Sequence, residues 1–462
     1  MTLWSATDAA AATGGTTQGD WDVDGFGIDS RTIRPGQMFV ALKATRDGHD
    51  FVRAALDAGA TAALVDRIPA GCEDAPLLVV GNVQTALEAL GRAGRARTGA
   101  KVIAVTGSVG KTSTKEMLRH CLSSQGLTHA AIKSYNNHWG VPLTLAAIPV
   151  EADFAVVEIG MNHPGEIAPL TAMVAPDVAM VINVSAVHME AFADGVPGIA
   201  REKASIFDGL VAGGTAIWNA DLEVSTILAR QGTVSFGRVE TADWRLLDVN
   251  AGSDNTSCAA STPLGPIMFR IGAPGAHFAM NALASLAAVH AVGADVARAA
   301  LRLMDWTPPE GRGQRHAVLL HPDQAPVDLI DDAYNANPAS VGAALDLLAA
   351  THVPRRARRI AILGDMKELG QTGPDLHAGL AGHPAMDTID MVHTVGPLMR
   401  RLHDAVRPDQ RGYHEDDTLR LAVHLRDMVR PGDAVLVKGS LSMKMATLVE
   451  GLRALDDAKP KG

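Results

Sequence analysis

The stretch from Lys101 to Leu118, KVIAVTGSVGKTSTKEML, constrains the fold more than any other part of the chain. Its first residues are apolar or β-branched and predict a buried parallel strand, whereas the residues after Lys111 predict an amphipathic helix. Gly107 and Gly110 interrupt the pattern between them. A strand, a glycine loop and a helix in this order gather backbone N–H groups around one point at a helix N-terminus, which favours a bound anion.

The side chains of this loop indicate that the anion is a nucleoside triphosphate. Lys111 adds a full positive charge, and the Thr112 hydroxyl is suited to hold Mg²⁺. The short form T-G-x-x-G-K-T stands here, because Val105 occupies the position of the first glycine of the common pattern. A tight connection without a ligand is the alternative, which Gly-Lys-Thr-Ser at the helix start disfavours. The residues expected to contact ATP in this stretch are Thr106, Gly107, Ser108, Gly110, Lys111, Thr112 and Ser113.

Length and hydrophobic pattern predict an α/β protein of three domains. A chain of 462 residues exceeds a single core. Residues 1–100 predict a small α/β domain, 101–313 a central doubly wound, mostly parallel sheet, and 314–462 a Rossmann-like domain. Within the central domain we expect a β-rich insertion at 241–271 and one long helix at 276–303. In the first domain a helix is expected at 83–97, and in the last domain helices are expected at 338–350 and 418–429.

Composition excludes several classes of function. The net charge of −10 disfavours broad binding of nucleic acid or anionic membranes. No apolar run reaches membrane-spanning length, and the first residues lack the pattern of a secretory signal. The three cysteines lie far apart without metal-ligand spacing, which is typical of small buried side chains in a reducing compartment. We therefore expect a cytoplasmic monomer that is not inserted in a membrane.

Three further side chains are candidates for the chemistry of the central domain. Glu158 ends an apolar strand, where an unpaired carboxylate is costly, so either Mg²⁺ or a structural Arg or Lys is expected beside it. His188 follows the strand predicted at 178–184, and a lone histidine there is usually a loop residue. Lys203, judged by composition alone, is a solvated helix lysine. In the N-terminal domain, Ser30, Arg31 and His49 are suited to a nucleotide, although a capped turn and an Asp-Gly loop explain them equally well.

Several motifs together resemble the Mur ligases, ATP-dependent amide ligases of bacterial cell-wall synthesis, and the resemblance covers essentially the whole chain. The strings that carry it, in family order, are Asp29-Ser-Arg31, Asp47-Gly-His49, Thr106 to Thr112, Asn136-Asn137-x-x-Gly140, Glu158 to Glu166, His188 to Lys203, Asp331 to Pro338, Leu363 to Gly370, and Lys438 to Lys444. Within the family, the pattern is most similar to the members that add a dipeptide.

The resemblance implies a set of ligands. ATP would bind with two Mg²⁺ ions, held by Thr112, Glu158, His188 and a carbamylated Lys203, and these with Lys111 would form the catalytic group. Adenine would contact Asn281 and Tyr334, ribose Asp331, and the phosphates Arg312. The residues expected to bind the substrates, UDP-N-acetylmuramoyl-tripeptide and D-alanyl-D-alanine, are Ser30, Arg31, His49, Asn136, Asn137, Asn162, His163, Asn335, Asn337 and Asp365.

Two alternative functions remain open at this point. The chain resembles, less closely, ligases that add a single amino acid, including those of the folylpolyglutamate type. It is also compatible with a binding protein that hydrolyses ATP only to change shape. A ligase must activate a carboxylate, and the γ-phosphoryl group of ATP does so by forming an acyl phosphate that an amine then attacks.

Overall fold

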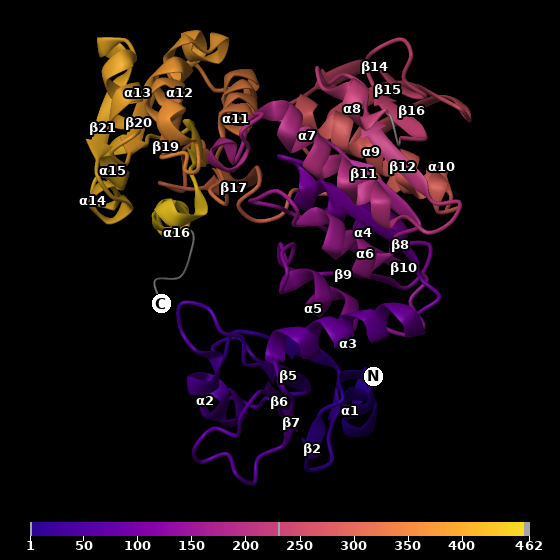
Figure 1. The fold of residues 1–462 in the computed structure, drawn as a ribbon. Helices are drawn as coiled ribbons and strands as arrows, with labels where there is room; N and C mark the ends of the chain where they lie inside the picture. The colour runs from indigo at the N-terminus through magenta and orange to yellow at the C-terminus, as the bar shows by residue number, and fades with distance from the viewer. Residues whose placement is uncertain (1, 230–231, 457–462) are drawn as a thin grey trace.

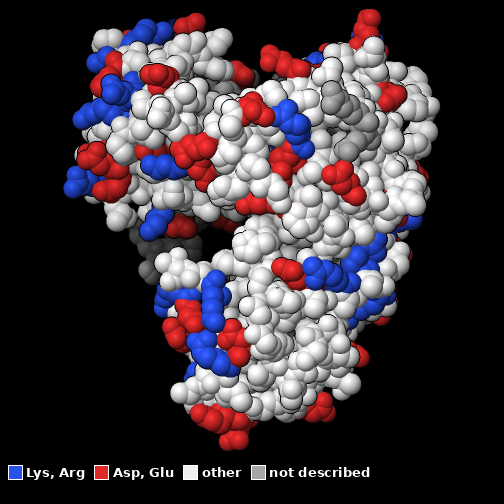
Figure 2. Space-filling view, in the orientation of Figure 1, with Lys and Arg blue, Asp and Glu red and all other residues white. Residues whose placement is uncertain are grey.

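Three large β-sheets organise the computed structural model, which describes residues 2–229 and 232–456. In Figure 1 they form three lobes: an N-terminal lobe (residues 2–100) below, a central lobe (101–313) at the upper right and a C-terminal lobe (314–456) at the upper left. On the face shown in Figure 2, basic and acidic side chains are interspersed over all three lobes. The expected α/β class with a parallel-dominated central sheet is confirmed.

The nine-stranded central sheet runs in the order β16-β15-β14-β13-β12-β11-β8-β10-β9. Strand β8 (Lys101–Thr106) lies in its interior and pairs in parallel with β10 (Phe154–Glu158) and β11 (Val178–Val181). Ile103 and Val105 of β8 face one hydrophobic core, and Val102 and Ala104 face the other. Because the strands are parallel, the loops that follow β8, β10 and β11 meet at one edge, which is where ligands bind in such sheets.

Helices cover both faces of this sheet. On one face lie α4 (Lys111–Leu122), α9 (Ala276–Ala291) and α10 (Val296–Arg302), and on the other α6 (Ile167–Val174) and α7 (Val196–Ala204). The single helix expected at 276–303 is therefore two helices. Gly293, with φ of 78°, ends the first, and the Asp295 side chain caps the second by accepting from the Arg298 N–H.

The β-rich segment at 241–271 is part of the central sheet and not a separate insertion. Strands β12 (Thr215–Asn219), β13 (Val234–Gly237) and β14 (Trp244–Ala251) continue the parallel order, and β15 (Thr256–Thr262) and β16 (Gly265–Ile271) add two antiparallel strands. Their alternating apolar residues, among them Cys258 and Phe269, complete the core beneath α9. At the opposite edge, β9 (Thr128–Ala130) pairs with β10.

The C-terminal lobe holds a six-stranded sheet in the order β17-β18-β22-β19-β20-β21. Strands β18 (Val327–Asp332), β22 (Ala434–Lys438), β19 (Arg359–Gly364), β20 (Met391–Val395) and β21 (Arg411–Glu415) are parallel, and β17 (Gln314–Val318) is antiparallel. Helix α11 (Pro338–Ala350) matches its prediction. The helix expected at 418–429 is two short ones, α14 (Thr418–Ala422) and α15 (Leu425–Met428), and α12 (Gly373–Gly379), α13 (Arg400–Ala405) and α16 (Ala446–Arg453) complete the lobe.

The N-terminal lobe has a five-stranded sheet in the order β2-β7-β6-β5-β4. Its strands are β2 (Thr16–Gln18), β4 (Gly25–Gly27), β5 (Gln37–Val40), β6 (Ala62–Val65) and β7 (Leu77–Val79), with helices α2 (Val52–Asp57) and α3 (Val83–Arg97). A short sheet of β1 (Trp4–Ser5) and β3 (Asp22–Val23) and helix α1 (Ala6–Thr13) were absent from the sequence expectations. The alanine-rich α1 lacks a distinct apolar stripe, so its pattern gives little signal.

Helix α3 packs closely on α5 (Gly140–Ala146) and joins the N-terminal lobe to the central one. Leu143 and Ala146 of α5 belong to the same hydrophobic cluster as Trp4 and the strands of the N-terminal sheet. The Trp4 indole also donates a buried hydrogen bond of 2.8 Å to the Ala146 carbonyl. The core of the N-terminal lobe is thus closed by a helix of the central lobe.

The structure can be compared with two expectations from the sequence, one on membrane-spanning segments and one on the cysteines. Over residues 2–229 and 232–456, no helix combines the length and the hydropathy needed to cross a membrane. The cysteines Cys72, Cys121 and Cys258 are buried free thiols, as their spacing predicted. Burial raises the pKa of Cys121 and of Cys258 to about 12, so both are small apolar side chains in practice.

The close packing of α3 on α5 depends on glycine at position 94. A Cβ atom there would lie 2.9 Å from the Ala146 Cα atom and closer still to the Leu145 carbonyl. We predict that Gly94→Ala lowers the free energy of unfolding by about 1–3 kcal/mol, because overpacking outweighs the better helix propensity of alanine. Urea unfolding followed by tryptophan fluorescence measures it.

Gly379→Ala is the matched control, since Gly379 is also helical and nothing lies within 4 Å of its Cβ position. This change should raise stability by about 0.4–1 kcal/mol. Equal stability of the two variants would contradict the packing argument.

Candidate active site

The loop between β8 and α4 has the geometry expected of a phosphate site. Gly110 precedes α4 with φ of 81°, a left-handed conformation that glycine adopts without strain. A Cβ at Gly107 would lie 2.6 Å from Ile182. The Lys111 ammonium donates a 2.7 Å hydrogen bond to the Gly107 carbonyl, so the side chain folds back over the loop. Burial lowers the pKa of Lys111, and Glu158 partly offsets this.

The Glu158 carboxylate lies beside this loop at the end of β10 and is only 3% exposed. The Thr112 hydroxyl donates to its Oε2 over 2.8 Å, and the Asn136 amide donates to its Oε1 over 2.7 Å. The Ser134 hydroxyl lies 2.8 Å from the Thr112 hydroxyl. A cluster of oxygens with one carboxylate results, which fits Mg²⁺ shared with phosphates.

No group of three or more His, Cys, Asp or Glu side chains able to hold a metal occurs among the described residues. Mg²⁺ in phosphoryl-transfer sites is usually held by one or two carboxylates together with substrate phosphates, not by a protein cage. The donor set of Glu158 and Thr112 therefore fits an ion that arrives with ATP.

The opposite wall is formed by residues 311–313, at the end of the central lobe, and by the C-terminal lobe. Arg312 donates a 3.0 Å hydrogen bond to Ser134, and its guanidinium lies 4.2 Å from the centre of the Tyr334 ring. Both carboxylate oxygens of the buried Asp331 accept backbone N–H groups, from Gly311 over 3.0 Å and from Ala333 over 3.2 Å. Burial raises the pKa of Asp331.

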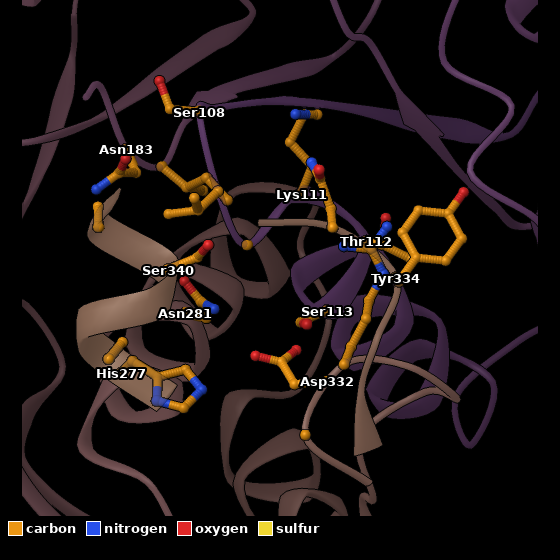
Figure 3. A pocket seen from close by; sticks show the side chains of 18 of the residues that line it. Ser108, Lys111, Thr112, Ser113, Asn183, His277, Asn281, Asp332, Tyr334 and Ser340 are labelled. Carbon is orange, nitrogen blue, oxygen red and sulfur yellow. The ribbon is translucent and has the colours of Figure 1, made fainter. Parts of the chain in front are cut away.

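These walls enclose a first cavity of about 400 Å³ between the phosphate loop, the start of α9 and the C-terminal lobe. Figure 3 shows labelled side chains from all three arranged around one hollow. Asn281 of α9 lies against the loop, since a Cβ at Gly110 would be 3.0 Å from its amide nitrogen. Of the residues expected to bind ATP, those that line this cavity are Ser108, Gly110, Lys111, Thr112, Ser113, Asn281, Arg312 and Tyr334.

The first cavity also contains residues that the sequence reasoning missed. Lys438, only 2% exposed, donates 2.7 Å hydrogen bonds to the Asp332 carboxylate and to the Asn335 carbonyl. Burial raises the pKa of Asp332, and Lys438 opposes this. His277 at the start of α9 also lines the cavity, and burial lowers its pKa to about 4, so its imidazole is neutral. The family strings at 331–338 and 438–444 were the available signals for the pair of Asp332 and Lys438.

A second cavity of about 520 Å³ adjoins the first. The side chains that border both cavities are Ser108, Lys111, Asn136, Tyr334, Asn335 and Asn337. The second cavity is also lined by Asn162, His188, Lys367, Glu368, Ser440 and Ser442. Lys111 thus lies where a molecule in one cavity meets a molecule in the other.

His188 and Lys203 differ from the ordinary loop and surface residues that composition suggested. Lys203 is only 2% exposed, and burial together with the charge of Lys111 holds its pKa well below the usual range. The Nδ1 atom of His188 lies 2.6 Å from Oε2 of Glu368 in the C-terminal lobe, and this hydrogen bond lowers the pKa of Glu368.

The His188–Glu368 contact has an unfavourable backbone cost. Both residues are left-handed, with φ of 54° and 64°, at about 1–2 kcal/mol each. Their side chains are 24% and 61% exposed, and such an ion pair contributes about 1 kcal/mol or less. The free energy that this contact contributes is therefore too small to account for the strained backbone at both residues.

Several expected site residues lie elsewhere or are engaged in local structure. Arg31 is exposed and pairs with Asp29, and His49 is buried between Asp47 and Asp66. The hydrogen bond from Arg31 is the main cause that lowers the pKa of Asp29. The positive charge of Lys133 in the central lobe lowers it further.

Four other expected residues have structural partners. Asn137 accepts backbone N–H groups at the start of α5, and Asn337 caps α11 in a capping box. His163 is exposed and bonds Glu166. Asp365 is fully buried outside both cavities, and its carboxylate binds the Met399 N–H and Lys367, each over 2.8 Å.

Comparison with known proteins places this geometry in a family. Residues 22–97 match the Mur ligase family catalytic domain, 105–289 the Mur ligase middle domain, and 315–441 the Mur ligase glutamate ligase domain. A UDP-N-acetylmuramoyl-tripeptide–D-alanyl-D-alanine ligase of Escherichia coli (strain K12) is 35% identical over 450 residues, covering 95% of this chain and 96% of that protein.

Solved structures agree over nearly the whole chain. MurF from Acinetobacter baumannii superposes with a TM-score of 0.82 at 29% identity, covering 98% of this chain and 99% of the other. A MurF ligase from Thermotoga maritima, solved in complex with ADP, gives 0.76 at 26% identity, covering 94% and 98%.

The ion pair of the buried Lys438 with the partly buried Asp332 yields a stability prediction. Lys438→Met leaves a carboxylate that is 21% exposed without its cation, so we expect a loss of about 1–3 kcal/mol in the free energy of unfolding. The double variant Lys438→Met with Asp332→Leu removes the unpaired charge and should regain most of this loss. Urea unfolding of both variants measures it, and equal losses in the two would rule out the charge explanation.

Proposed function

This chain belongs to the Mur ligase family, and we propose that it joins D-alanyl-D-alanine to UDP-N-acetylmuramoyl-tripeptide while ATP is cleaved to ADP and phosphate. The observation that carries the proposal is the pair of cavities that share Lys111 as a common wall. A ligase needs this arrangement, because the γ-phosphoryl group must reach a carboxylate held in a separate site. A protein that only hydrolyses ATP has no use for the second cavity.

The relatives favour the dipeptide over a single amino acid. The ligases of Escherichia coli, Bacillus subtilis and Rickettsia prowazekii that match this chain over most of its length are all named for D-alanyl-D-alanine. We infer that the second cavity takes this dipeptide and the reacting end of the muramoyl peptide. The shared residues Asn335 and Asn337 lie where both substrates meet the nucleotide.

We assign ATP to the first cavity. The loop N–H groups and Lys111 bind the phosphates, Arg312 reaches the same region from the segment that leads into the C-terminal lobe, and Asn281 and Tyr334 border the base. Asp331 is our candidate for the ribose. Transfer of the γ-phosphoryl group to the peptide carboxylate forms an acyl phosphate, and attack by the dipeptide amine releases phosphate and leaves an amide.

Mg²⁺ supplies charge neutralisation where a carboxylate and a triphosphate meet. We propose that Thr112 and Glu158 hold one ion and that His188, Glu158 and a carbamylated Lys203 hold a second. Burial favours the neutral amine of Lys203, and only the neutral amine has the lone pair that adds to CO₂. The product is a carbamate anion, formed with release of one proton, which turns a buried neutral amine into an oxygen ligand.

Lys367 is our candidate for the terminal carboxylate of the dipeptide. Lys367 lines the second cavity, and its ammonium donates a 2.8 Å hydrogen bond to the buried Asp365 carboxylate. Asp365, which the sequence assigned to the dipeptide directly, would then act through Lys367. Asn162 lines the same cavity and remains a candidate contact.

We assign residues 1–100 to the UDP-sugar, 101–313 to ATP and 314–462 to the ligase step. Ser30, Arg31 and His49 remain the candidates for the nucleotide-sugar, with Asn136, Asn137 and His163 nearer the reacting end. All of these residues belong to one chain, so a monomer suffices. ATP and a nucleotide-linked substrate place the reaction in the cytoplasm.

Phosphate release tests the proposed reaction. We expect release from ATP only when both the muramoyl tripeptide and D-alanyl-D-alanine are present. Lys111→Ala should reduce the rate by about 10²–10³-fold, because it removes a charge that stabilises the transferred group. A coupled phosphate assay measures both. Release that continues when either substrate is left out would refute the ligase proposal and favour the ATPase.

The proposed modification of Lys203 has its own test. Lys203→Ala removes the metal ligand, so activity should fall by at least about tenfold, and added acetate or another short carboxylic acid should restore part of it. Lys101→Ala is the control, since Lys101 is an exposed lysine of the same lobe paired with Asp177. Full activity of Lys203→Ala without added acid would remove Lys203 from the proposed metal site.

A further inference from the structure

A hydrogen-bonding contact between His188 and Glu368 joins the loop after β11 to the C-terminal lobe beside the second cavity. His188 lies on that loop and lines the cavity, and its Nδ1 atom lies 2.6 Å from the Glu368 carboxylate. Glu368 also lines the cavity. The two residues are 180 positions apart, so their contact depends on how the two lobes are placed against each other.

Both ends of this contact have a strained backbone. Among the described residues, those other than glycine with positive φ are Ala175, His188, Arg356, Glu368 and Lys444. Two of these five touch each other, and the ion pair is too exposed to offset the cost. Strain of this kind persists where a particular placement of a side chain is needed, as at active sites.

The surrounding loops are packed closely enough to hold the pair in place. Gly370, two residues after Glu368, has φ of 61°, and a Cβ there would lie 2.9 Å from Cγ of Glu190. Leu369 between them is buried at 3% exposure. The segment that carries Glu368 therefore rests on the segment that carries His188.

We propose that Glu368 is a positioning residue that orients the His188 imidazole for metal binding. A carboxylate at Nδ1 fixes the proton on that nitrogen and leaves Nε2 as the free lone pair, which is the usual arrangement behind a metal-bound histidine. The inference rests on the proposed function, because it takes His188 as a ligand of Mg²⁺. Since Glu368 belongs to the C-terminal lobe, the metal site is complete only when that lobe is in contact with the central one.

Metal binding tests this proposal directly. We would titrate Mn²⁺, as a probe for Mg²⁺, into the enzyme–ADP complex and measure its dissociation constant by calorimetry. Glu368→Ala should raise this constant by about 10–100-fold, because the imidazole loses its orienting partner. Glu368→Gln keeps a hydrogen-bond acceptor, so it should restore most of the affinity. Asp194→Ala, which removes an exposed carboxylate of the same loop that pairs with Arg201 instead, should leave the constant unchanged.

Two results would overturn the proposal. One is wild-type Mn²⁺ affinity in Glu368→Ala. The other is an equal loss of Mn²⁺ affinity in Glu368→Gln and Glu368→Ala. That result would mean that the carboxylate acts as a metal ligand or through its charge, and not as the hydrogen-bond acceptor that orients His188. Because Glu368 is exposed, both variants should fold, and thermal unfolding checks this.

The outcome is separable from the test of the proposed function. Wild-type enzyme that releases phosphate without both substrates fails as a ligase, whatever the variants do. Wild-type enzyme that requires both substrates, while Glu368→Ala keeps its Mn²⁺ affinity, leaves the ligase proposal intact and removes only the role of Glu368.

Discussion

The buried Glu158 carboxylate is the point on which the rest of the site depends. A negative charge at 3% exposure is costly unless hydrogen bonds and cations surround it. Thr112 and Asn136 donate to it, and Lys111 lies within its electrostatic reach. These partners come from the helix after β8 and from the loop before α5. One carboxylate thereby fixes the relative positions of the phosphate loop and of the segment that borders both cavities.

The central and C-terminal lobes are needed together because neither encloses the first cavity alone. The central lobe supplies the phosphate loop and Glu158, its last residues supply Arg312, and the C-terminal lobe supplies Tyr334 and Lys438. A hydrogen bond from Arg312 to Ser134 spans the first cavity. This division explains why cations are abundant on both sides: phosphates, carboxylates and Glu158 would otherwise repel one another when the lobes come together.

Local patterns predicted much of the fold and part of the site. The phosphate loop, α3 and α11 were predicted because periodicity and turn residues act over short distances. Helix α1 and the break at Gly293 were missed, since alanine-rich sequence carries little periodic signal. Lys438 was missed for another reason. Its partners Asp332 and Asn335 lie at the end of β18 and just after it, and β18 pairs with β22, but a sequence does not state which strands pair.

The closure of the N-terminal core by α5 has a consequence for how this protein is divided into parts. Trp4 and the apolar faces of the first sheet pack on Leu143 and Ala146, which come after the phosphate loop in the chain. A fragment that stopped near residue 100 would expose these side chains to water. The first hundred residues are therefore not an exchangeable module, and the N-terminal and central lobes must be inherited as one unit.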